Sequence, residues 1–287
     1  MTYKKFFNQK EISVIITLYK TPLLQLKKLV QYQDFKLIIL SQKPDHQEKN
    51  ILKGILRKNF TYYSIKKNIG LSRASNFLLS KVKTKYCLFT QADVEINLNS
   101  ISLLNLALMS NKDGILSSPR FVKTIYNKNN FFNKIKLAVK NVKSFDAACF
   151  LFNVEKMKKI GFFDEDFFLY WEDIFLLEKL KKERCKILYV KDALAAHNSG
   201  RSTAYNYKTF FIRTVNFKFG EYLFDYKMDK FRFIKILRNI INFPLYLLFY
   251  LSTFQLKKLF IKLFDFFGIM KFIFFYLKND QIKKING

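Results

Sequence analysis

Apolar positions in the first hundred residues alternate between short unbroken runs and runs with helical spacing. The unbroken runs predict strands, and apolar residues that recur every three or four positions predict helices. The expected strands are 12–18, 35–40, 61–66 and 86–89. One expected helix begins with Thr21 as N-cap and Pro22 as its first residue, and a second covers residues 72–82. This alternation predicts an α/β fold with a mostly parallel central sheet flanked by helices.

The pattern continues less regularly up to about residue 205. Helices are expected over 99–109, 154–160 and 171–183, and strands over 145–152, 187–190 and 193–197. Beyond residue 205, aromatic residues alternate with Lys and Arg, and the apolar runs 240–254 and 260–277 are interrupted by polar or charged residues. A bilayer span needs about 20 apolar residues, so these runs favour interfacial helices suited to anionic headgroups. An ordinary packed helical extension and a true span are the alternatives.

Composition bounds the class of protein. Half of the 287 residues are hydrophobic, which is enough for a sizeable core and argues against disorder. The net charge of +29 indicates an anionic partner such as a membrane face, a phosphorylated substrate or nucleic acid. The alternative is the codon bias of a genome rich in A and T, which favours Lys, Asn, Ile and Phe together, and the spread of the lysines along the whole chain leaves this alternative open. No nucleic acid partner is expected, since no recognised nucleic-acid motif is present.

Cysteine usage and the first residues indicate the compartment. The three cysteines, Cys87, Cys149 and Cys185, form no CxxC pair and suggest neither a zinc site nor a disulfide framework. A reducing cytoplasm fits this usage. Residues 1–10 are polar and basic, unlike a signal peptide. We therefore expect a cytoplasmic protein, peripheral on the cytoplasmic face of the inner membrane; the oligomeric state stays open.

Asp93 is the first residue with candidate chemistry. It follows a buried strand, and a carboxylate at the carboxyl end of a parallel strand is well placed to hold a divalent cation against a diphosphate. Glu95 lies two residues further on, as a possible helper in metal binding. His197 follows a short apolar run and would complete a site for Mn²⁺ or a similar ion. The structural alternatives are a turn-forming Asp93 and a packed His197.

Glu172 and Asp173 form the second candidate group, in the first turn of an expected helix. Acidic residues there interact favourably with the helix dipole, which is a sufficient structural reason for them. The functional interpretation is a general base that accepts a proton from an attacking hydroxyl. Trp171 is the single tryptophan and adjoins the pair, where its ring suits stacking on a sugar or packing in a core.

Six segments in order resemble the family 2 glycosyltransferases, particularly the rhamnosyltransferase-like members. They are Ser-Val-Ile-Ile-Thr-Leu-Tyr-Lys at 13–20, Asn-Ile-Gly-Leu-Ser-Arg-Ala-Ser-Asn at 68–76, Gln-Ala-Asp-Val at 91–94, Ala-Cys-Phe-Leu at 148–151, Gly-Phe-Phe-Asp-Glu-Asp-Phe-Phe-Leu-Tyr-Trp-Glu-Asp at 161–173, and His197. The resemblance covers about residues 11–203. It implies a GT-A fold with a nucleotide-binding half over about 11–98 and an acceptor-binding half over about 99–205. Residues 206–287 would form a helical, basic and apolar, membrane-associated extension.

The resemblance also implies roles for individual residues. Asp173 would be the catalytic base, with Glu172, Trp171 and Cys149 on the acceptor side. Asp93 would hold Mn²⁺ or Mg²⁺ together with His197. The donor would be bound by the first strand, the Asn68 segment and the metal motif; the residues are Thr17, Leu18, Tyr19, Gln42, Asn68, Arg73, Gln91 and Asp93.

The implied activity is inverting transfer of a sugar from a nucleoside-diphosphate donor to a hydroxyl of a glycan or lipid-linked glycan, as in polysaccharide biosynthesis. Two departures stand out: Ser41-Gln42 replaces a usual acidic residue after the second strand, and Gln91 replaces the Asp that often begins the metal motif. They leave the donor open and admit an inactive transferase-like scaffold as an alternative. A basic nucleic-acid-binding protein is the remaining, less favoured alternative.

Overall fold

The computed structural model describes residues 7–56, 60–124, 138–197 and 200–286. The chain divides into two compact units, described separately below. The sheet unit comprises Met1–Asp164 and Leu176–Ala204, and the helical unit comprises Glu165–Phe175 and Tyr205–Gly287. One boundary between the units falls between Ala204 and Tyr205. The acidic segment 165–175, by contrast, groups with the C-terminal helices.

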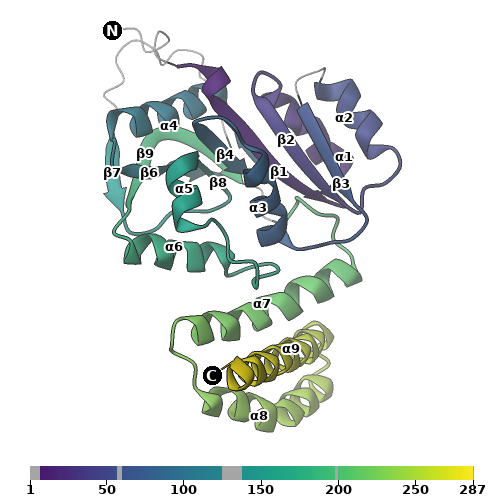
Figure 1. Cartoon of the computed structure of the whole chain (residues 1–287). Helices are drawn as coiled ribbons and strands as arrows, with labels where there is room; N and C mark the ends of the chain where they lie inside the picture. Colours follow the sequence, from purple (N-terminus) through teal and green to yellow (C-terminus); the bar gives the residue numbers. More distant parts are fainter. Residues whose placement is uncertain (1–6, 57–59, 125–137, 198–199, 287) are drawn as a thin grey trace. The chain divides into compact units, whose positions relative to one another are not determined.

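The described residues of the sheet unit form a nine-stranded sheet (Figure 1). Its order is β3-β2-β1-β4-β8-β6-β9-β5, with β7 paired to β9. The strands are β1 (Ile12–Tyr19), β2 (Lys36–Gln42), β3 (Phe60–Ile65), β4 (Tyr86–Thr90), β5 (Val94–Ile96), β6 (Gly114–Val122), β7 (Val139–Val142), β8 (Cys149–Asn153) and β9 (Lys186–His197). The parallel pairs are β1–β2, β1–β4, β2–β3 and β6–β9. The antiparallel pairs are β4–β8, β6–β8, β5–β9 and β7–β9. The expected α/β class with a mostly parallel sheet is confirmed.

Helices cover both faces of this sheet. One face packs against α1 (Leu23–Lys28), the short 3-10 helix Leu29–Tyr32, α2 (Glu48–Leu56) and α4 (Leu98–Ser110). The other face packs against α3 (Leu71–Lys81), α5 (Val154–Ile160) and the C-terminal part of α6 (Glu172–Lys182). A further 3-10 helix, Gln9–Glu11, precedes β1. Two-sided burial explains why β1, β2 and β4 are nearly continuous apolar runs and not alternating ones.

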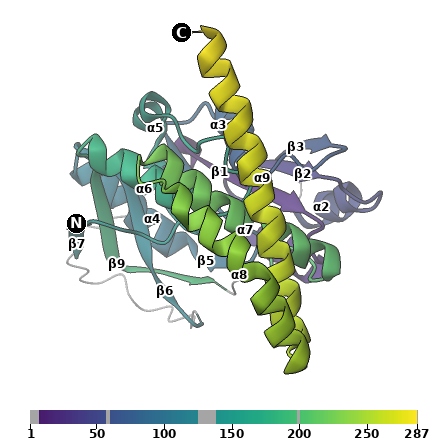
Figure 2. The same cartoon turned by 90° about the horizontal axis from the view of Figure 1, so that it is seen from below.

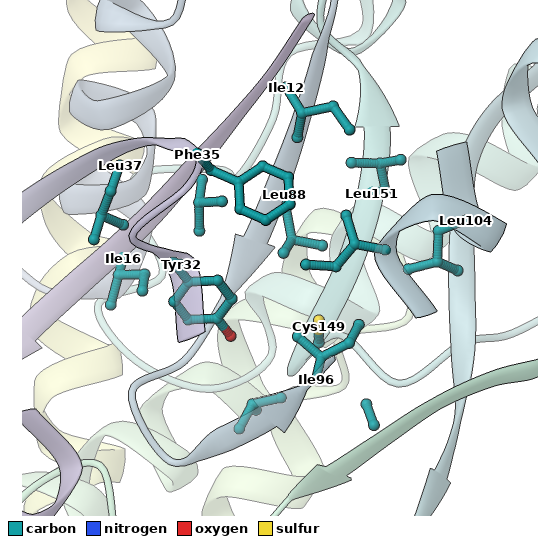
Figure 3. Packing of buried hydrophobic residues seen from close by; sticks show 14 of the residues in the cluster. Ile12, Ile16, Tyr32, Phe35, Leu37, Leu88, Ile96, Leu104, Cys149 and Leu151 are labelled. Atoms are coloured by element: carbon teal, nitrogen blue, oxygen red, sulfur yellow. The ribbon is translucent and has the colours of Figure 1, made fainter. Parts of the chain in front are cut away.

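The core on the first face centres on β1, β2, β4 and β8 (Figure 3). Ile12, Ile16 and Leu88 are fully buried there, with Tyr32 and Phe35 packed among them. Burying side chains of this size stabilises the fold by about 1.5–3 kcal/mol each. This packing fixes the strands whose carboxyl ends carry the candidate donor residues.

The helical unit consists of α7 (Tyr207–Lys227), α8 (Phe233–Ser252) and α9 (Leu256–Asn286), together with the acidic segment (Figure 2). Asn206 and Thr209 form a reciprocal capping box that fixes the start of α7. The helix α9 packs against both α7 and α8. Their shared core contains Phe167 of the acidic segment, Phe219 and Tyr222 of α7, and Phe272 of α9.

Several local expectations need correction. The N-cap of α1 is Pro22 and not Thr21, because the Thr21 hydroxyl accepts a hydrogen bond from the Tyr19 amide instead. The strand expected over 145–152 is confined to β8, since Asp146 accepts from the Ala148 amide in a preceding turn. The two strands expected over 187–197 form one strand, β9, whose register with β6 shifts between Pro119 and Arg120.

Candidate functional site

The carboxyl ends of the parallel strands bring the expected donor residues to one edge of the sheet. Tyr19, the last residue of β1, pairs with Gln42, the last residue of β2. Leu18 is buried, whereas Thr17 and Tyr19 are half-buried. Ligands in open α/β sheets bind at this edge, because loops leave the strands there.

Hydrogen bonds fix the loop that follows β3 to the same edge. The Gln42 side-chain carbonyl accepts from the Ile69 amide at 2.8 Å. The Asn68 side-chain carbonyl accepts from the Gly70 amide at 3.0 Å, just before α3 begins. Arg73 lies in the first turn of α3 and is exposed. The structure therefore brings Gln42 and Asn68 together, with Arg73 one helical turn away.

Asp93 lies in the turn between β4 and β5, and β5 pairs with β9 so that Val94 stands opposite His197. Gln91 begins this turn, and its amide donates to the Ala148 carbonyl. The Asp93 side chain is 0% exposed. Its Oδ2 accepts from the amides of Arg201 and Ser202 at 3.0 and 2.9 Å. Its Oδ1 lies 3.7 Å from His197 Nε2.

The Asp93–His197 pair fits a divalent cation. Asp93 Oδ1 is buried and has no hydrogen-bond partner among the residues that the structure describes. Two ligands of one ion, each at about 2.0–2.2 Å, lie up to about 4 Å apart, and the observed separation falls within that reach. Among the described residues, no group of three or more His, Cys, Asp or Glu side chains could hold a metal, so further ligands must come from elsewhere.

Glu95 lies outside this pair. Its Oε1 is ion-paired with Lys28 Nζ of α1 at 2.5 Å. Cys149, expected on the acceptor side, is fully buried in the core of β8, where burial raises the pKa of its thiol to about 12. Glu95 is thus engaged in an ion pair with α1 and Cys149 in the core of the sheet unit, and the metal role of Glu95 and the acceptor role of Cys149 stay predictions.

The acidic segment has an unusual backbone just before α6. Tyr170 and Trp171 both have left-handed conformations, with φ of 68° and 70°. Such a conformation costs a bulky residue about 1–2 kcal/mol, and it persists only where the surroundings enforce it. Two such residues in succession end the irregular chain and start α6 at Glu172. Strain of this kind next to two carboxylates is typical of functional sites.

The two carboxylates differ in environment. Glu172 is 5% exposed, and its Oε2 has no hydrogen-bond partner among the described residues. Burial, helped by the neighbouring charge of Asp173, raises the pKa of Glu172 to about 8. Asp173 is half-buried, and its Oδ1 accepts from the Ile174 amide at 2.8 Å. Near neutral pH, Glu172 therefore holds a proton, which leaves Asp173 as the better candidate base.

Trp171 is anchored to α7. Its Nε1 donates to the Phe217 carbonyl at 3.0 Å, and its ring lies against Phe217 and Phe224. The approach to α7 is close because Gly220 has no side chain: a Cβ there would lie 2.7 Å from Trp171 Cδ1. These contacts compensate for the left-handed backbone. Sequence reasoning placed Trp171 on the acceptor side; the structure adds an anchoring contact, and the acceptor role stays a prediction.

Other contacts within the helical unit hold the acidic segment. Lys227 Nζ of α7 pairs with Asp166 Oδ2 at 2.6 Å. Lys271 of α9 lies over the Phe168 ring and donates to Asn216. Sequence reasoning missed these partners, since nothing in residues 206–287 has the spacing of a chemical motif. Gly220, a glycine inside a helical run, was a signal that could have drawn attention to the close approach of Trp171.

Comparison with known proteins places these features in a family. Residues 13–177 match the family model described as Glycosyl transferase family 2. The teichoic acid poly(glycerol phosphate) polymerase of Staphylococcus epidermidis is 28% identical over 151 residues, which cover 47% of this chain and 20% of that protein. The chain therefore spans a small part of the length of that relative.

Solved structures with a similar fold are glycosyltransferases of the GT-A class. GalNAc-T7 in complex with UDP, GalNAc and Mn²⁺ has a TM-score of 0.54 at 13% identity, over 65% of this chain and 42% of that chain. The mannosyltransferase PcManGT from Pyrobaculum calidifontis, in complex with GDP-Man and Mn²⁺, has a TM-score of 0.53 at 13% identity, over 73% of this chain and 61% of that chain. TarS of S. aureus has a TM-score of 0.51 at 14% identity, over 72% of this chain and 39% of that chain. The expected GT-A fold is confirmed.

Proposed function

The chain belongs to glycosyl transferase family 2, and on this premise we propose that it transfers a sugar from a nucleoside-diphosphate donor to a hydroxyl group of a glycan or lipid-linked glycan. The observation that supports this most is the Asp93–His197 pair. A fully buried carboxylate oxygen with no hydrogen-bond partner among the described residues lies 3.7 Å from a histidine nitrogen, at the strand edge where nucleotides bind.

The sheet unit binds the donor in this proposal. The ends of β1 and β2 and the Gln42–Ile69 contact line the nucleoside part of the donor site, and Arg73, in the first turn of α3, interacts with the diphosphate. Asp93 and His197 hold the divalent cation, Mn²⁺ or Mg²⁺, as Mn²⁺ is held by two of the similar solved structures. When bound, the cation stabilises the negative charge that develops on the leaving diphosphate.

The acidic segment supplies the base. The acceptor oxygen attacks the anomeric carbon while the bond between that carbon and the diphosphate oxygen breaks. The proton of the acceptor hydroxyl passes to the Asp173 carboxylate. A single displacement inverts the anomeric configuration and requires no enzyme nucleophile. Glu172, protonated near neutral pH, donates a hydrogen bond to the acceptor and does not compete as a base.

Two finer expectations from the sequence belong to the proposal. A rhamnosyltransferase-like specificity is one candidate for the donor sugar, and Ser41-Gln42 is the position at which the base or ribose would be distinguished. A cytoplasmic enzyme peripheral on the membrane is the second, because a lipid-linked acceptor lies at that surface. The S. epidermidis relative, named as a teichoic acid poly(glycerol phosphate) polymerase, supports an acceptor of the teichoic acid class.

A panel of nucleotide sugars tests the proposal. A true donor raises the Tm of the chain in the presence of Mn²⁺ or Mg²⁺, because a ligand that binds only the native state stabilises it by mass action. At a donor concentration 100 times its Kd, the expected gain is about 2.7 kcal/mol. Asp93→Asn should abolish the metal-dependent part of the shift, and Asp113→Asn, at an exposed carboxylate paired with Lys186, serves as the matched control.

The outcome separates the alternatives. Donor hydrolysis or transfer that accompanies the thermal shift supports the enzyme. A metal-dependent shift without any turnover, across the panel and with glycan acceptors, favours the inactive scaffold that the Gln91 departure admits. Absence of any shift, together with salt-dependent RNA binding, would replace the transferase proposal with the nucleic-acid-binding alternative.

A further inference from the structure

The helix α8 exposes an apolar stripe on the face that points away from the rest of the helical unit. Its packed face carries Ile236, Ile240 and Phe243, of which Phe243 stacks on Phe266 of α9 at 4.4 Å. On the opposite face, the exposed residues recur every three or four positions. We call them the α8 stripe: Ile234, Leu237, Ile241, Leu245 and Leu248. A helix at the surface of a soluble protein carries polar residues on this face.

Neither ordinary explanation for an apolar helix applies to α8. By length and composition, it is the one helix among the described residues that could cross a membrane. A core helix of a soluble protein would be mostly buried, yet 6% of the apolar window of α8 is buried. A signal sequence would lie near the N-terminus, whereas α8 covers Phe233–Ser252. The apolar stripe therefore requires a partner outside the unit.

The end of α8 adds an independent observation. Phe254 terminates the helix in a left-handed conformation with φ 53°, a position that favours Gly or Asn. Its side chain is 87% exposed. A bulky aromatic residue that is both strained and exposed gains nothing within the folded chain. Leu251 and Leu256 on either side are also exposed, and we call the three residues the hairpin tip.

Charge identifies the partner. No Asp or Glu occurs between Lys230 and Phe264, and the exposed cations of this interval lie before or within the first two turns of α8 and just after the hairpin tip. They are Lys230, Arg232 and Arg238 around the start of α8, and Lys257 and Lys258 after the hairpin tip. Cations that flank an apolar stripe match the anionic headgroups and acyl boundary of a lipid leaflet. A second copy of the chain would place these cations against one another.

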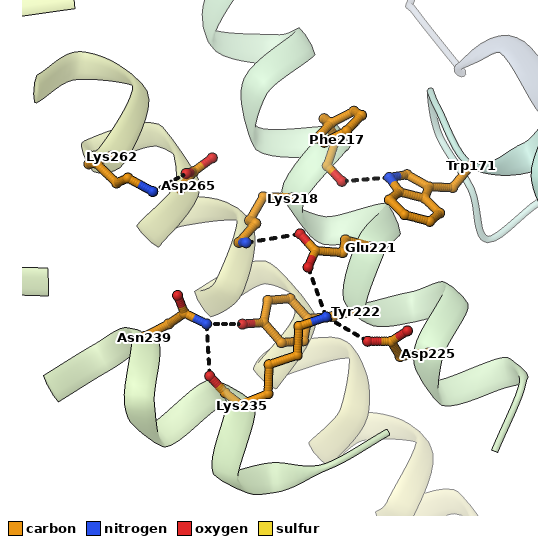
Figure 4. A network of polar contacts seen from close by, with 10 residues as sticks. All are labelled: Trp171, Phe217, Lys218, Glu221, Tyr222, Asp225, Lys235, Asn239, Lys262 and Asp265. Carbon is orange, nitrogen blue, oxygen red and sulfur yellow. Dashed lines mark hydrogen bonds and ion pairs between the residues drawn. The ribbon is translucent and has the colours of Figure 1, made fainter. Parts of the chain in front are cut away.

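The polar contacts of α8 decide between spanning the bilayer and lying on it. Lys235 of α8 is ion-paired with Glu221 and Asp225 of α7 at 2.8 and 2.7 Å, and Asn239 donates to the Tyr222 hydroxyl (Figure 4). These contacts hold the first two turns against α7. The remaining turns, from residue 240 to 252, extend about 20 Å at 1.5 Å per residue, short of the hydrocarbon thickness of about 30 Å.

We propose that the α8 stripe and the hairpin tip dock the helical unit in the plane of an anionic lipid leaflet. The inference gives the peripheral location proposed above a defined surface, and it does not depend on sugar transfer. Because Glu165–Phe175 belongs to the same compact unit as α8, the docked body also carries the acidic segment.

Vesicle sedimentation of the full chain tests the proposal. We expect binding to phosphatidylcholine vesicles that contain phosphatidylglycerol, and weaker binding when that lipid is omitted or salt is raised. Leu245→Glu combined with Leu248→Glu should lower the partition coefficient at least about ten-fold, because two apolar side chains no longer leave water. Leu24→Glu on α1 is the matched control, since Leu24 and Leu245 are both 63% exposed. Its binding should stay unchanged.

Phe254→Gly separates membrane binding from folding. Glycine suits the left-handed conformation, so the Tm should stay equal or rise while vesicle binding falls several-fold. A parallel fall of Tm and binding would overturn the role of the tip. Thermal stabilisation by nucleotide sugars, measured without lipid, should be the same in these variants as in the unsubstituted chain. Failure of every nucleotide sugar to stabilise the unsubstituted chain would count against the transferase proposal alone.

Three results would overturn the docking proposal. The first is no binding of the unsubstituted chain to anionic vesicles, and the second is equal loss in Leu24→Glu. The third is a dimer in solution that dissociates in the Leu245→Glu variant without vesicle binding, which would assign the stripe to a second copy. Carbonate extraction checks the orientation: release from membranes supports in-plane docking, and retention would replace it with a span.

Discussion

Replacing Gly220 with Ala tests whether α7 positions the acidic segment. Gly220 lies in the middle of α7, where the added Cβ would stand 2.7 Å from Trp171 Cδ1 and 3.2 Å from the Tyr170 carbonyl oxygen. Both contacts are closer than van der Waals distance, and one is with backbone. Trp171 therefore has to move away from α7, and it takes with it the backbone that leads directly into Glu172 and Asp173.

The magnitude follows from opposing terms. Ala in place of Gly stabilises a helix interior by about 0.8–1 kcal/mol. Overpacking costs about 1–3 kcal/mol, and loss of the 3.0 Å bond from Trp171 Nε1 to the Phe217 carbonyl costs about 1 kcal/mol more. The net destabilisation is thus on the order of 1–3 kcal/mol. A misplacement of about 1 Å can lower the rate of a positioned reaction about 100-fold, so kcat should fall on the order of 10- to 100-fold.

Gly54→Ala is the matched control. Gly54 lies in α2, and an added Cβ there would meet nothing within 4 Å. This variant should gain about 0.5–1 kcal/mol in urea unfolding with unchanged kcat. Transfer kinetics and donor-induced thermal shifts should be measured for both variants. If Gly220→Ala behaves like Gly54→Ala, with higher stability and full kcat, then α7 does not position the segment.

Three further substitutions address individual carboxylates. Asp173→Asn should lower kcat by several orders of magnitude with donor binding near normal, as measured by single-turnover kinetics and donor titration; retained turnover would remove Asp173 from the base role. Glu95→Gln should leave Mn²⁺-dependent donor affinity unchanged in calorimetry, because Glu95 pairs with Lys28, and a loss as large as that of Asp93→Asn would bring Glu95 into the metal site. Burial raises the pKa of Glu172 in the folded state to about 8 from its ordinary value of 4.5. The native state therefore binds an extra proton between these pH values, and the free energy of unfolding should fall as pH rises from about 5 to 8. Glu172→Gln should flatten that slope in denaturant unfolding, and an unaltered slope would show that Glu172 is not the group that titrates.

The position of the acidic segment also changes how the C-terminal helices should be tested. A truncation near residue 206 would remove α7 and α9, which contribute Phe219 and Phe272 to the core around Phe167. Such a chain would lose the packing that holds Trp171 as well as the α8 stripe. Loss of vesicle binding after truncation would therefore not separate a docking surface from a damaged unit, whereas single substitutions on the exposed stripe would.

Parts of the fold could be predicted because their signals are local. The strands β1, β2 and β4 and the helix α3 are long apolar or periodic segments, and their expected ranges agree with the structure. The strands β5, β6 and β7 were missed. β5 and β7 have three and four residues, and β6 contains Pro119, which a single sequence marks as a break. Pairing with β9 and β8 decides all three, and such partners are remote in the chain.

The sequence by itself determined the family, the α/β class and the residue types at the candidate site, because these depend on ordered motifs and on side-chain periodicity. Tertiary structure alone decided the surroundings of each candidate carboxylate. The β5–β9 register places Asp93 beside His197, and Lys28 forms an ion pair with Glu95. Burial raises the pKa of Glu172 to about 8. Tertiary structure also decided that Trp171 is anchored on α7 at Gly220. Hydrogen bonding, ion pairing and desolvation depend on distances between groups far apart in the chain, and a linear pattern carries no record of those distances.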